Sequence, residues 1–346
     1  MIRSALTPVD LRLLAEAGGA APSLHNSQPW RFRPTPDGGG VEVHADPDRA
    51  VPLADADGSG LHIAAGAALF NLRVAAARLG RAASVRLLPD PANPWLLAVL
   101  DLSGPALGAA PFGRELYAAI TRRHSSREPF ANRDVPEAVV AELIAAARDE
   151  GVALAVLEED GVRRVLEVTA EAEDRTAHDP ARQAETRSWL RPDAGVGGGV
   201  GGPGTGDGLP YAVLGAQDHD ARVPMREFAG RPPQHEGPVR PSRRFEALPQ
   251  LCTLGTAGDE PADWLRTGQA LERVWLLATA RGLRLTVWHQ AVEWPDLRWR
   301  LRDPADGPGH IHLVLRVGYG PPGAATPRRP VADVLDPPVR PGAPSA

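Results

Sequence analysis

The spacing of apolar residues predicts a chain in which helices and strands alternate. Apolar side chains occupy almost every face of a helix over residues 60–79, and a helix of that kind is buried. An Ala/Leu-rich stretch predicts a second long helix over residues 261–281. Shorter apolar runs bounded by turn residues predict strands. The expected strands cover residues 41–45, 85–88, 95–102, 152–157, 252–256, 283–288 and 311–317.

Capping and proline signals predict further helices. Residues 7–10 combine a hydroxyl cap, a first-turn proline and an acid near the positive end of the helix dipole. Two glycines at positions 18–19 end this helix. More helices are expected from about residue 113, from Pro136 and over residues 161–177.

Two of the expected helix–strand units resemble each other. Residues 66–80 and 268–282 both begin with Gly, contain an Ala-Leu pair and a central Arg, and carry an Arg near a closing Gly. A strand follows each of them. Two stacked copies would bury both helices against each other, although Ala-rich helices can also resemble each other by chance. The pattern predicts an α+β chain with two tandem α/β/α-type repeats around central buried helices.

The predicted organisation is a first half over residues 1–112, a second half over residues 113–336 and a tail over residues 337–346. A Gly/Pro-rich stretch at about 190–250 interrupts the second half, and its most glycine-rich part covers residues 195–208. A loop of this length is usually a functional lid or a disordered insertion, and both alternatives stay open. No Gly-Lys-Ser/Thr follows the glycines, so the stretch is not a phosphate loop.

Composition limits the possible functions. The 346 residues are 43% hydrophobic, which allows a sizeable core. Since 38 basic residues face 43 acidic ones, no global positive field attracts nucleic acid or anionic lipid. Cys252 is the only cysteine, which excludes an intrachain disulfide and a thiolate metal cluster. The sequence shows no signal peptide and no uncharged run of membrane-spanning length, so a cytoplasmic location is expected.

The absence of lysine also restricts the chemistry. Any phosphate must be held by arginine, histidine or backbone N–H groups, and a lysine nucleophile or Schiff base is excluded. A Gly-x-Ser-x-Gly elbow and a dinucleotide-binding glycine fingerprint are both missing. His310 and His312 share one strand face, but no third metal ligand is recognisable beside them. The run at residues 218–220 is interpreted as solvated. No metal site is predicted.

One loop offers a dense set of hydrogen-bonding groups. Ser23, His25, Asn26 and Gln28 supply a hydroxyl, an imidazole and two amides, and a proline and Trp30 follow. Amides both donate and accept, which suits the edge of a heterocycle such as the pyrimidine ring of a flavin. From residue types alone, a surface turn anchored by Trp30 is the simpler interpretation.

The order of the residues changes that interpretation. Pro-Ser-x-x-Asn-x-Gln-Pro-Trp at residues 22–30 resembles the flavin-contact loop of the nitroreductase superfamily. Arg-His-Ser-Ser-Arg at 123–127 resembles the superfamily's Arg-Arg/His-Ser-x-Arg/Lys element, although an extra residue precedes Phe130. Gly-Tyr-Gly at 318–320, followed by the arginine pair at 328–329, is similar to its closing segment. If each is considered alone, the arginines at 123–127 and at 328–329 could instead be charged residues exposed to solvent.

The resemblance implies a nitroreductase-like α+β fold with antiparallel-rich sheets and bound FMN. Arg123 and Ser125 would hold the phosphate and ribityl chain, Arg127 would lie near the ring, and the closing arginines would reach the phosphate. Residues 287–290 would present backbone N–H groups near the reactive nitrogen. The flavin carries the chemistry, so no catalytic side chain is expected. The residues expected to bind FMN are Ser23, His25, Asn26, Gln28, Arg123, His124, Ser125, Arg127, Trp288, His289, Gln290, Arg328 and Arg329.

The order of the motifs along the chain is also informative. In nitroreductases the arginine element precedes the amide loop, whereas here it follows the loop at the start of the second repeat. The chain therefore resembles a fused dimer with one complete flavin site, as in the Acg-type branch, in which a lid covers the flavin. It would act as a monomeric pseudo-dimer or as a homodimer.

Two functions follow from the resemblance. The first is hydride transfer from NAD(P)H through FMN to a nitro, quinone or related small aromatic acceptor. The alternative is an FMN-sequestering or stress-related protein whose lid, at about residues 190–250, blocks turnover with NAD(P)H. The sequence does not choose between NADH and NADPH, and it does not identify the acceptor.

Overall fold

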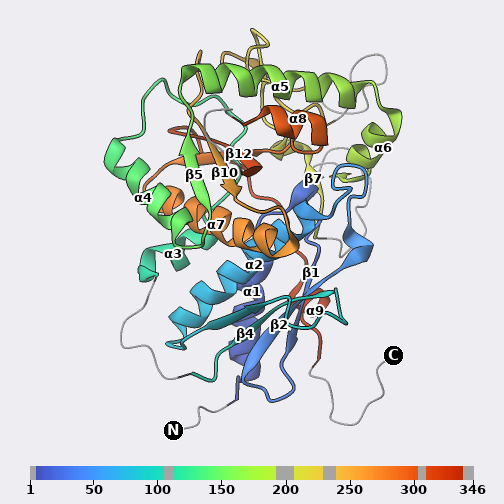
Figure 1. The fold of residues 1–346 in the computed structure, drawn as a ribbon, viewed down its shortest axis with the longest axis vertical. Coiled ribbons are helices and arrows are strands. Elements are labelled where there is room, and N and C mark those ends of the chain that lie inside the picture. Colours follow the sequence, from blue (N-terminus) through green and yellow to red (C-terminus); the bar gives the residue numbers. More distant parts are fainter. Residues whose placement is uncertain (1–4, 105–111, 192–205, 229–238, 303–308, 338–346) are drawn as a thin grey trace.

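A computed structural model describes residues 5–104, 112–191, 206–228, 239–302 and 309–337. Two four-stranded sheets lie on either side of two long central helices (Figure 1). The first sheet has the strand order β1-β2-β4-β3, and every neighbouring pair is antiparallel. Its strands are β1 (Trp30–Pro34), β2 (Gly40–Ala45), β3 (Ser84–Leu87) and β4 (Leu96–Asp101).

The second sheet repeats this arrangement. Its order is β11-β12-β10-β5, again with antiparallel neighbours throughout. Its strands are β5 (Ala153–Val156), β10 (Leu251–Thr256), β11 (Arg284–Trp288) and β12 (His310–Gly318). In both sheets the strand that follows the long helix lies at an edge, beside the last strand of its half. The predicted α+β class with antiparallel sheets is confirmed.

The helices form the layers around the sheets. They are α1 (Pro8–Gly19), α2 (Ser59–Arg78), α3 (Gly113–Ile120), α4 (Glu137–Arg148), α5 (Glu159–Ala177), α6 (Pro180–Ser188), α7 (Pro261–Ala280), α8 (Pro295–Arg300) and α9 (Val331–Val334). The first sheet packs on α1 and α2. The second packs on α4 and α7 through one face and on α5 and α8 through the other.

Helices α2 and α7 contact each other along their length at the centre of the molecule (Figure 1). Two glycines permit this close approach. A Cβ at Gly66 would lie 2.2 Å from the carbonyl oxygen of Leu265, and one at Gly268 would lie 2.0 Å from that of Ile63. The predicted mutual burial of the two similar helices is therefore observed, with one glycine from each helix at the contact.

Helix α2 is also long and apolar enough to cross a membrane, by length and composition alone. In this structure 83% of its most apolar window is buried inside the protein. Its neighbours are α7, α1 and the first sheet. The apolar composition of α2 is thus accounted for by its central position in the core.

Two isolated parallel bridges connect segments that are remote in sequence, the first within the second half and the second between the halves. Ser125 forms an isolated parallel bridge with Leu285 of β11, and Leu335 forms one with Phe32 of β1. Beside the second bridge, Asp336 binds Arg31. Each bridge adds a remote segment beside an edge strand of one sheet, β11 in the second sheet and β1 in the first. The proposed boundary between residues 112 and 113 stays a prediction.

Some elements were not predicted from the sequence. Strand β1 alternates apolar residues with arginines and ends in a proline, and α6 has no continuous apolar stripe. The stretch at about 190–250 also contains short strands: β6 (Leu190–Arg191) pairs with β7 (Leu209–Pro210), and β8 (Gln217–Asp218) pairs with β9 (Ser242–Arg243). Most of the glycine-rich tract lies outside the described residues.

Candidate functional site

A cavity lies between the two halves of the chain. Its walls come from the amide loop (residues 22–30), α2, α7, the end of β11, the insertion segment (residues 206–228) and the segment that follows β12. The predicted residues that line it are Ser23, His25, Asn26, Arg123, His124, Ser125, Arg127, Trp288, His289, Gln290 and Arg328. Motifs from both ends of the chain and from its middle therefore meet in one place.

The amide loop has an unusual backbone. His25, Asn26 and Gln28 have φ values of 50°, 56° and 53°, in the left-handed region that non-glycine residues rarely adopt. Each such residue costs on the order of 1–3 kcal/mol and persists only where its surroundings fix it. The hydroxyl of Ser23 helps to fix the loop, because its Oγ accepts a hydrogen bond from the backbone N–H of Gln28 at 2.9 Å.

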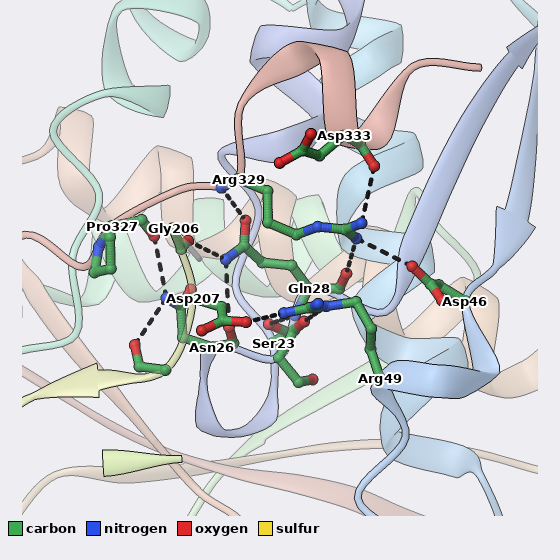
Figure 2. Close-up of polar contacts among 12 residues, drawn as sticks. Ser23, Asn26, Gln28, Asp46, Arg49, Gly206, Asp207, Pro327, Arg329 and Asp333 are labelled. Carbon is green, nitrogen blue, oxygen red and sulfur yellow. Dashed lines mark hydrogen bonds and ion pairs between the residues drawn. The ribbon is translucent and has the colours of Figure 1, made fainter. Parts of the chain in front are cut away.

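The two amide side chains bind backbone groups of remote segments, as Figure 2 shows. Asn26 Nδ2 donates to the carbonyl oxygens of Gly208 at 2.9 Å and Pro327 at 3.1 Å. Gln28 Nε2 donates to the carbonyl oxygen of Gly206 at 2.8 Å. The amide loop thus holds the insertion segment and the C-terminal segment together at the edge of the cavity.

Gln28 and Arg329 do not line the cavity, in contrast to the expectation that both bind FMN. Gln28 is fully buried, and its Oε1 accepts from the backbone N–H of Arg329 at 2.9 Å. The guanidinium of Arg329 binds Asp46 at 3.2 Å and the carbonyl oxygen of Asp333 (Figure 2). Their polar groups are used within the protein, so in this structure both residues support the site from behind.

A pair of arginines lies at one end of the cavity. Arg123, which is 3% exposed, and Arg328 both donate from Nη2 to the carbonyl oxygen of Ala20, at 2.9 and 3.0 Å. Arg123 also lies 4.6 Å above the ring of Trp275, and its Nε is 3.2 Å from Glu272 Oε1. Glu272 thus forms an ion pair with Arg123 and interacts only electrostatically with Arg328.

This arrangement leaves excess positive charge. Burial, and next the neighbouring charge of Arg123, lower the pKa of Arg328 to about 9. Burial is the main cause that holds the pKa of His124 below its ordinary value, and the charges of Arg123 and Arg328 add to it. Burial raises the pKa of Glu272 although Arg123 opposes the shift. An anion bound between the arginines would relieve their repulsion, so this end of the cavity is suited to a phosphate.

A second group of charges lies around Arg127. Arg127 donates from Nη1 to the carbonyl oxygen of Val213 at 2.8 Å and lies 5.4 Å from the ring of Phe228. Burial, and then the charges of Arg240 and Arg226, lower its pKa to about 10. Unlike the pair at Arg123, Arg127 has no acidic partner in the described contacts. It contributes positive charge to the cavity wall.

The end of β11 forms another wall. Val287, Trp288, His289 and Gln290 all line the cavity, and Trp288 is buried. Gln290 Nε2 donates to the carbonyl oxygen of Pro224 in the insertion segment at 3.3 Å. Residues 287–290 thus lie at the cavity wall, whereas their expected contact with a flavin stays a prediction.

Some residues of the site were missed by the sequence reasoning. Met225, Arg226 and Phe228 of the insertion segment line the cavity, and their irregular sequence context gave no signal. Glu272 did carry a signal in the sequence, because a carboxylate inside an apolar buried helix requires a cationic partner. Asn71 of α2 is equally conspicuous, being fully buried among apolar residues.

Other candidate sites are explained by internal contacts. His312 bonds Thr256 through Nε2 at 2.6 Å and Arg298 through Nδ1 at 2.9 Å, so both ring nitrogens are occupied. Asp218 accepts backbone N–H groups of its own loop, including that of Val223 at 3.0 Å. Within the described part of the chain, no three His, Cys, Asp or Glu residues are grouped as a metal site.

Comparison with known proteins identifies the family. A protein of Mycobacterium tuberculosis strain H37Rv, provisionally named NAD(P)H nitroreductase Rv3131, is 32% identical over 321 residues, which are 91% of this chain and 88% of the relative. The chain belongs to the nitroreductase family. Acg of the same strain, another provisionally named NAD(P)H nitroreductase, is 30% identical over 320 residues, covering 91% and 92% of the two chains. The predicted Acg-type resemblance of this nitroreductase is confirmed.

Solved structures give a weaker likeness. A nitroreductase with bound FMN from Bacteroides fragilis aligns with a TM-score of 0.36 and 13% identity, over 68% of this chain and 99% of that one. A nitroreductase-like family protein from Bacillus cereus aligns with a TM-score of 0.35 and 14% identity, over 66% and 96%. No protein-family model matches the sequence. The sequence relatives, and not these structures, establish the family of this nitroreductase.

Proposed function

We propose that this nitroreductase-family protein binds FMN in the cavity and transfers hydride from NAD(P)H to a nitro, quinone or related aromatic acceptor. The observation that carries the proposal is the pair of buried Arg123 and half-buried Arg328, which meet at the carbonyl oxygen of Ala20 and line a cavity with aromatic and apolar walls. The names of its relatives, NAD(P)H nitroreductases, support the same reaction class.

The polar groups on the cavity wall fit FMN. Arg123, Arg328, His124 and Ser125 would hold the phosphate and the ribityl chain, because guanidinium groups and hydroxyls are suitable donors to phosphate oxygens. The Nε atom of Arg328 is buried without a hydrogen-bond partner in the described residues, so it has donor capacity left for such a ligand.

The ring system would lie among the remaining predicted residues. Ser23, His25 and Asn26 on the amide loop and residues 288–290 face it from opposite halves of the chain, and Arg127 adds positive charge. A nearby cation favours an anionic reduced ring. Bound FMN would supply the two-electron chemistry, and the protein would bind, orient and shield it. The Nε2 atom of His25 is buried without a partner in the described residues, consistent with a ligand there.

The two halves would supply different parts of one site. Residues 1–112 contribute the amide loop and α2, and residues 113–336 contribute the arginine element, α7 and β11. A fusion of two nitroreductase-like units by gene duplication accounts for this division and for the identical strand orders of the two sheets. The chain would then act as a monomeric pseudo-dimer or pair again as a homodimer.

A second candidate function is FMN sequestration. It is favoured by the insertion segment, whose residues Leu209, Met225, Arg226 and Phe228 form part of the cavity wall. Hydrogen bonds from Asn26 and Gln28 hold the start of this segment in position. A segment held in this way over a bound flavin would act as a lid and restrict access for NAD(P)H.

Steady-state oxidation of NADH and NADPH, with menadione or nitrofurazone as acceptor, separates these functions. Rapid turnover by FMN-loaded protein supports the oxidoreductase and excludes sequestration. A yellow protein that dithionite reduces but neither nucleotide reduces supports sequestration. A protein that binds no FMN excludes both.

A further inference from the structure

One histidine of the cavity wall has the contacts of a proton donor. His289 follows β11 and lines the cavity, and only 11% of its side chain is exposed. Its Nδ1 lies 3.4 Å from Glu293 Oε1. Its Nε2 has no hydrogen-bond partner in the described residues. One ring nitrogen is therefore held by a carboxylate and the other is left for a ligand.

The carboxylate that holds His289 is itself fixed. Glu293, whose side chain is 1% exposed, forms ion pairs with Arg226 of the insertion segment and, at 3.5 Å, with Arg182 of α6. Burial raises the pKa of Glu293, but Arg226, His289 and His25 outweigh it and keep the pKa below its ordinary value. Glu293 is consequently ionised at neutral pH, so its contact with His289 requires a proton on Nδ1 of the imidazole, which donates to the carboxylate.

Other charged groups also surround His289. Asp55, in the loop before α2, interacts electrostatically with it and adds negative charge. Arg226 also lines the cavity, and its charge is paired with the carboxylates of Glu173 and Glu293. His25 of the amide loop lines the same cavity and interacts electrostatically with His289. Since burial, and next Arg226, lower the pKa of His25 to about 3, His25 is neutral. Of these two histidines, His289 is the one with a carboxylate partner.

We propose that His289, held by Glu293, donates a proton to the acceptor as the acceptor is reduced. This inference rests on the proposed FMN-dependent function. A quinone that receives a hydride from bound reduced FMN becomes a hydroquinone anion and needs one more proton. The Nε2–H bond of protonated His289 breaks, an O–H bond forms on the second quinone oxygen, and the imidazole recovers its proton from solvent.

The test compares FMN-loaded wild type, His289→Gln and the control His178→Gln, whose histidine is exposed at the end of α5. Each protein is reduced anaerobically with dithionite and mixed with either menadione or ferricyanide. Ferricyanide takes up electrons without a proton. We expect His289→Gln to slow oxidation by menadione about 100-fold, as is typical for loss of a general acid, and to leave oxidation by ferricyanide unchanged.

Two further readouts separate a proton role from a structural one. The contact of His289 with FMN is expected through its backbone N–H, which His289→Gln keeps, so the FMN dissociation constant of the variant, measured by fluorescence quenching, should match that of wild type. The solvent deuterium isotope effect on menadione reduction should be smaller in the variant than in wild type, because only the hydrogen transferred as hydride, which exchanges with solvent, still contributes to it. Equal menadione rates in wild type and His289→Gln overturn the proton role but not the FMN function, and so does an equal slowing with both oxidants. Failure of wild type to bind FMN overturns both proposals.

Discussion

Arg123 and Arg328 donate hydrogen bonds to the same oxygen, the carbonyl of Ala20, although 205 positions separate them in the sequence. One belongs to the arginine element and the other to the closing segment. Because both guanidinium groups are held at one carbonyl, and Glu272 forms an ion pair with Arg123 only, they form a preorganised cationic site. The proposed binding of the FMN phosphate rests on this relationship.

Removal of Arg123 should weaken FMN binding. Loss of a charge-assisted hydrogen bond to phosphate costs roughly 1.5–3 kcal/mol, so Arg123→Ala should raise the dissociation constant about 10- to 150-fold. Equilibrium titration of apoprotein with FMN measures the change. The matched control is Arg122→Ala, since Arg122 is the adjacent residue but is exposed and bonds only the carbonyl of Ala118 among the described contacts. Equal affinity of the Arg123 variant and wild type would refute the phosphate assignment.

The insertion segment should control the exit of FMN. Asp207, whose side chain is 8% exposed, forms ion pairs with Arg49 and, at 2.9 Å, with Arg191. Neutralising it in Asp207→Asn removes both charge pairs, and we expect FMN to dissociate several times faster. Stopped-flow displacement by an excess of apo-flavodoxin or another FMN acceptor gives the rate. Asp220→Asn, in the same segment but paired only with His219 among the described contacts, should behave as wild type. An unchanged rate of FMN dissociation in Asp207→Asn would mean that the ion pairs of Asp207 do not retain FMN.

The contact between α2 and α7 should depend on its glycines. In Gly66→Ala the new methyl group would overlap the carbonyl of Leu265 at 2.2 Å, and overpacking of this kind typically costs about 1–3 kcal/mol. Gly19→Ala is the control, because a Cβ there meets nothing within 4 Å. Urea unfolding measures both. If Gly66→Ala is as stable as Gly19→Ala, the helices separate more easily than this packing implies.

His312 should make the protein less stable in acid. Burial, and then Arg298, lower its pKa from 6.5 to about 4. Arg298 donates to Nδ1, so the folded protein holds the neutral ring, whereas the unfolded chain takes up a proton below pH 6.5. The contribution of neutral His312 to the free energy of unfolding is fully present above pH 6.5 and is lost as the pH falls from 6.5 to about 4. Below pH 4 the free energy of unfolding no longer changes through this residue. It amounts to at most on the order of 3 kcal/mol.

Urea unfolding at a series of pH values tests this contribution. The slope of unfolding free energy against pH in this window should be smaller in His312→Gln than in wild type. His25 acts in the same direction, because its pKa is also lowered, to about 3, so some slope will remain. Identical slopes in the two proteins would mean that His312 is not held neutral by its burial.

The sequence predicted the parts of the fold that are encoded locally. The apolar faces of α2, the proline and capping residues of α1 and the Ala/Leu pattern of α7 identified those helices to within a few residues. Strand β1 and helices α6, α8 and α9 were missed, because they are short or lack a continuous apolar stripe. Their stability comes from tertiary contacts that local patterns do not encode.

The sequence identified most residues of the candidate site, but it did not predict which groups each of them contacts. Ser23, Asn26 and Arg123 were identified by their order and do line the cavity. Gln28 was expected at the flavin, but the structure places it behind the wall, bonded to Gly206 and Arg329. An amide has the same residue type whether it serves a ligand or a backbone carbonyl, so only the folded chain distinguishes the two.

Quantification of FMN after reconstitution tests the central claim most directly. Purified protein is incubated with excess FMN and desalted, and the visible absorbance of the retained flavin is compared with the protein concentration. A single site built from both halves predicts one retained FMN per chain. A colourless protein would contradict flavin binding in this cavity, and two FMN per chain would contradict the single shared site.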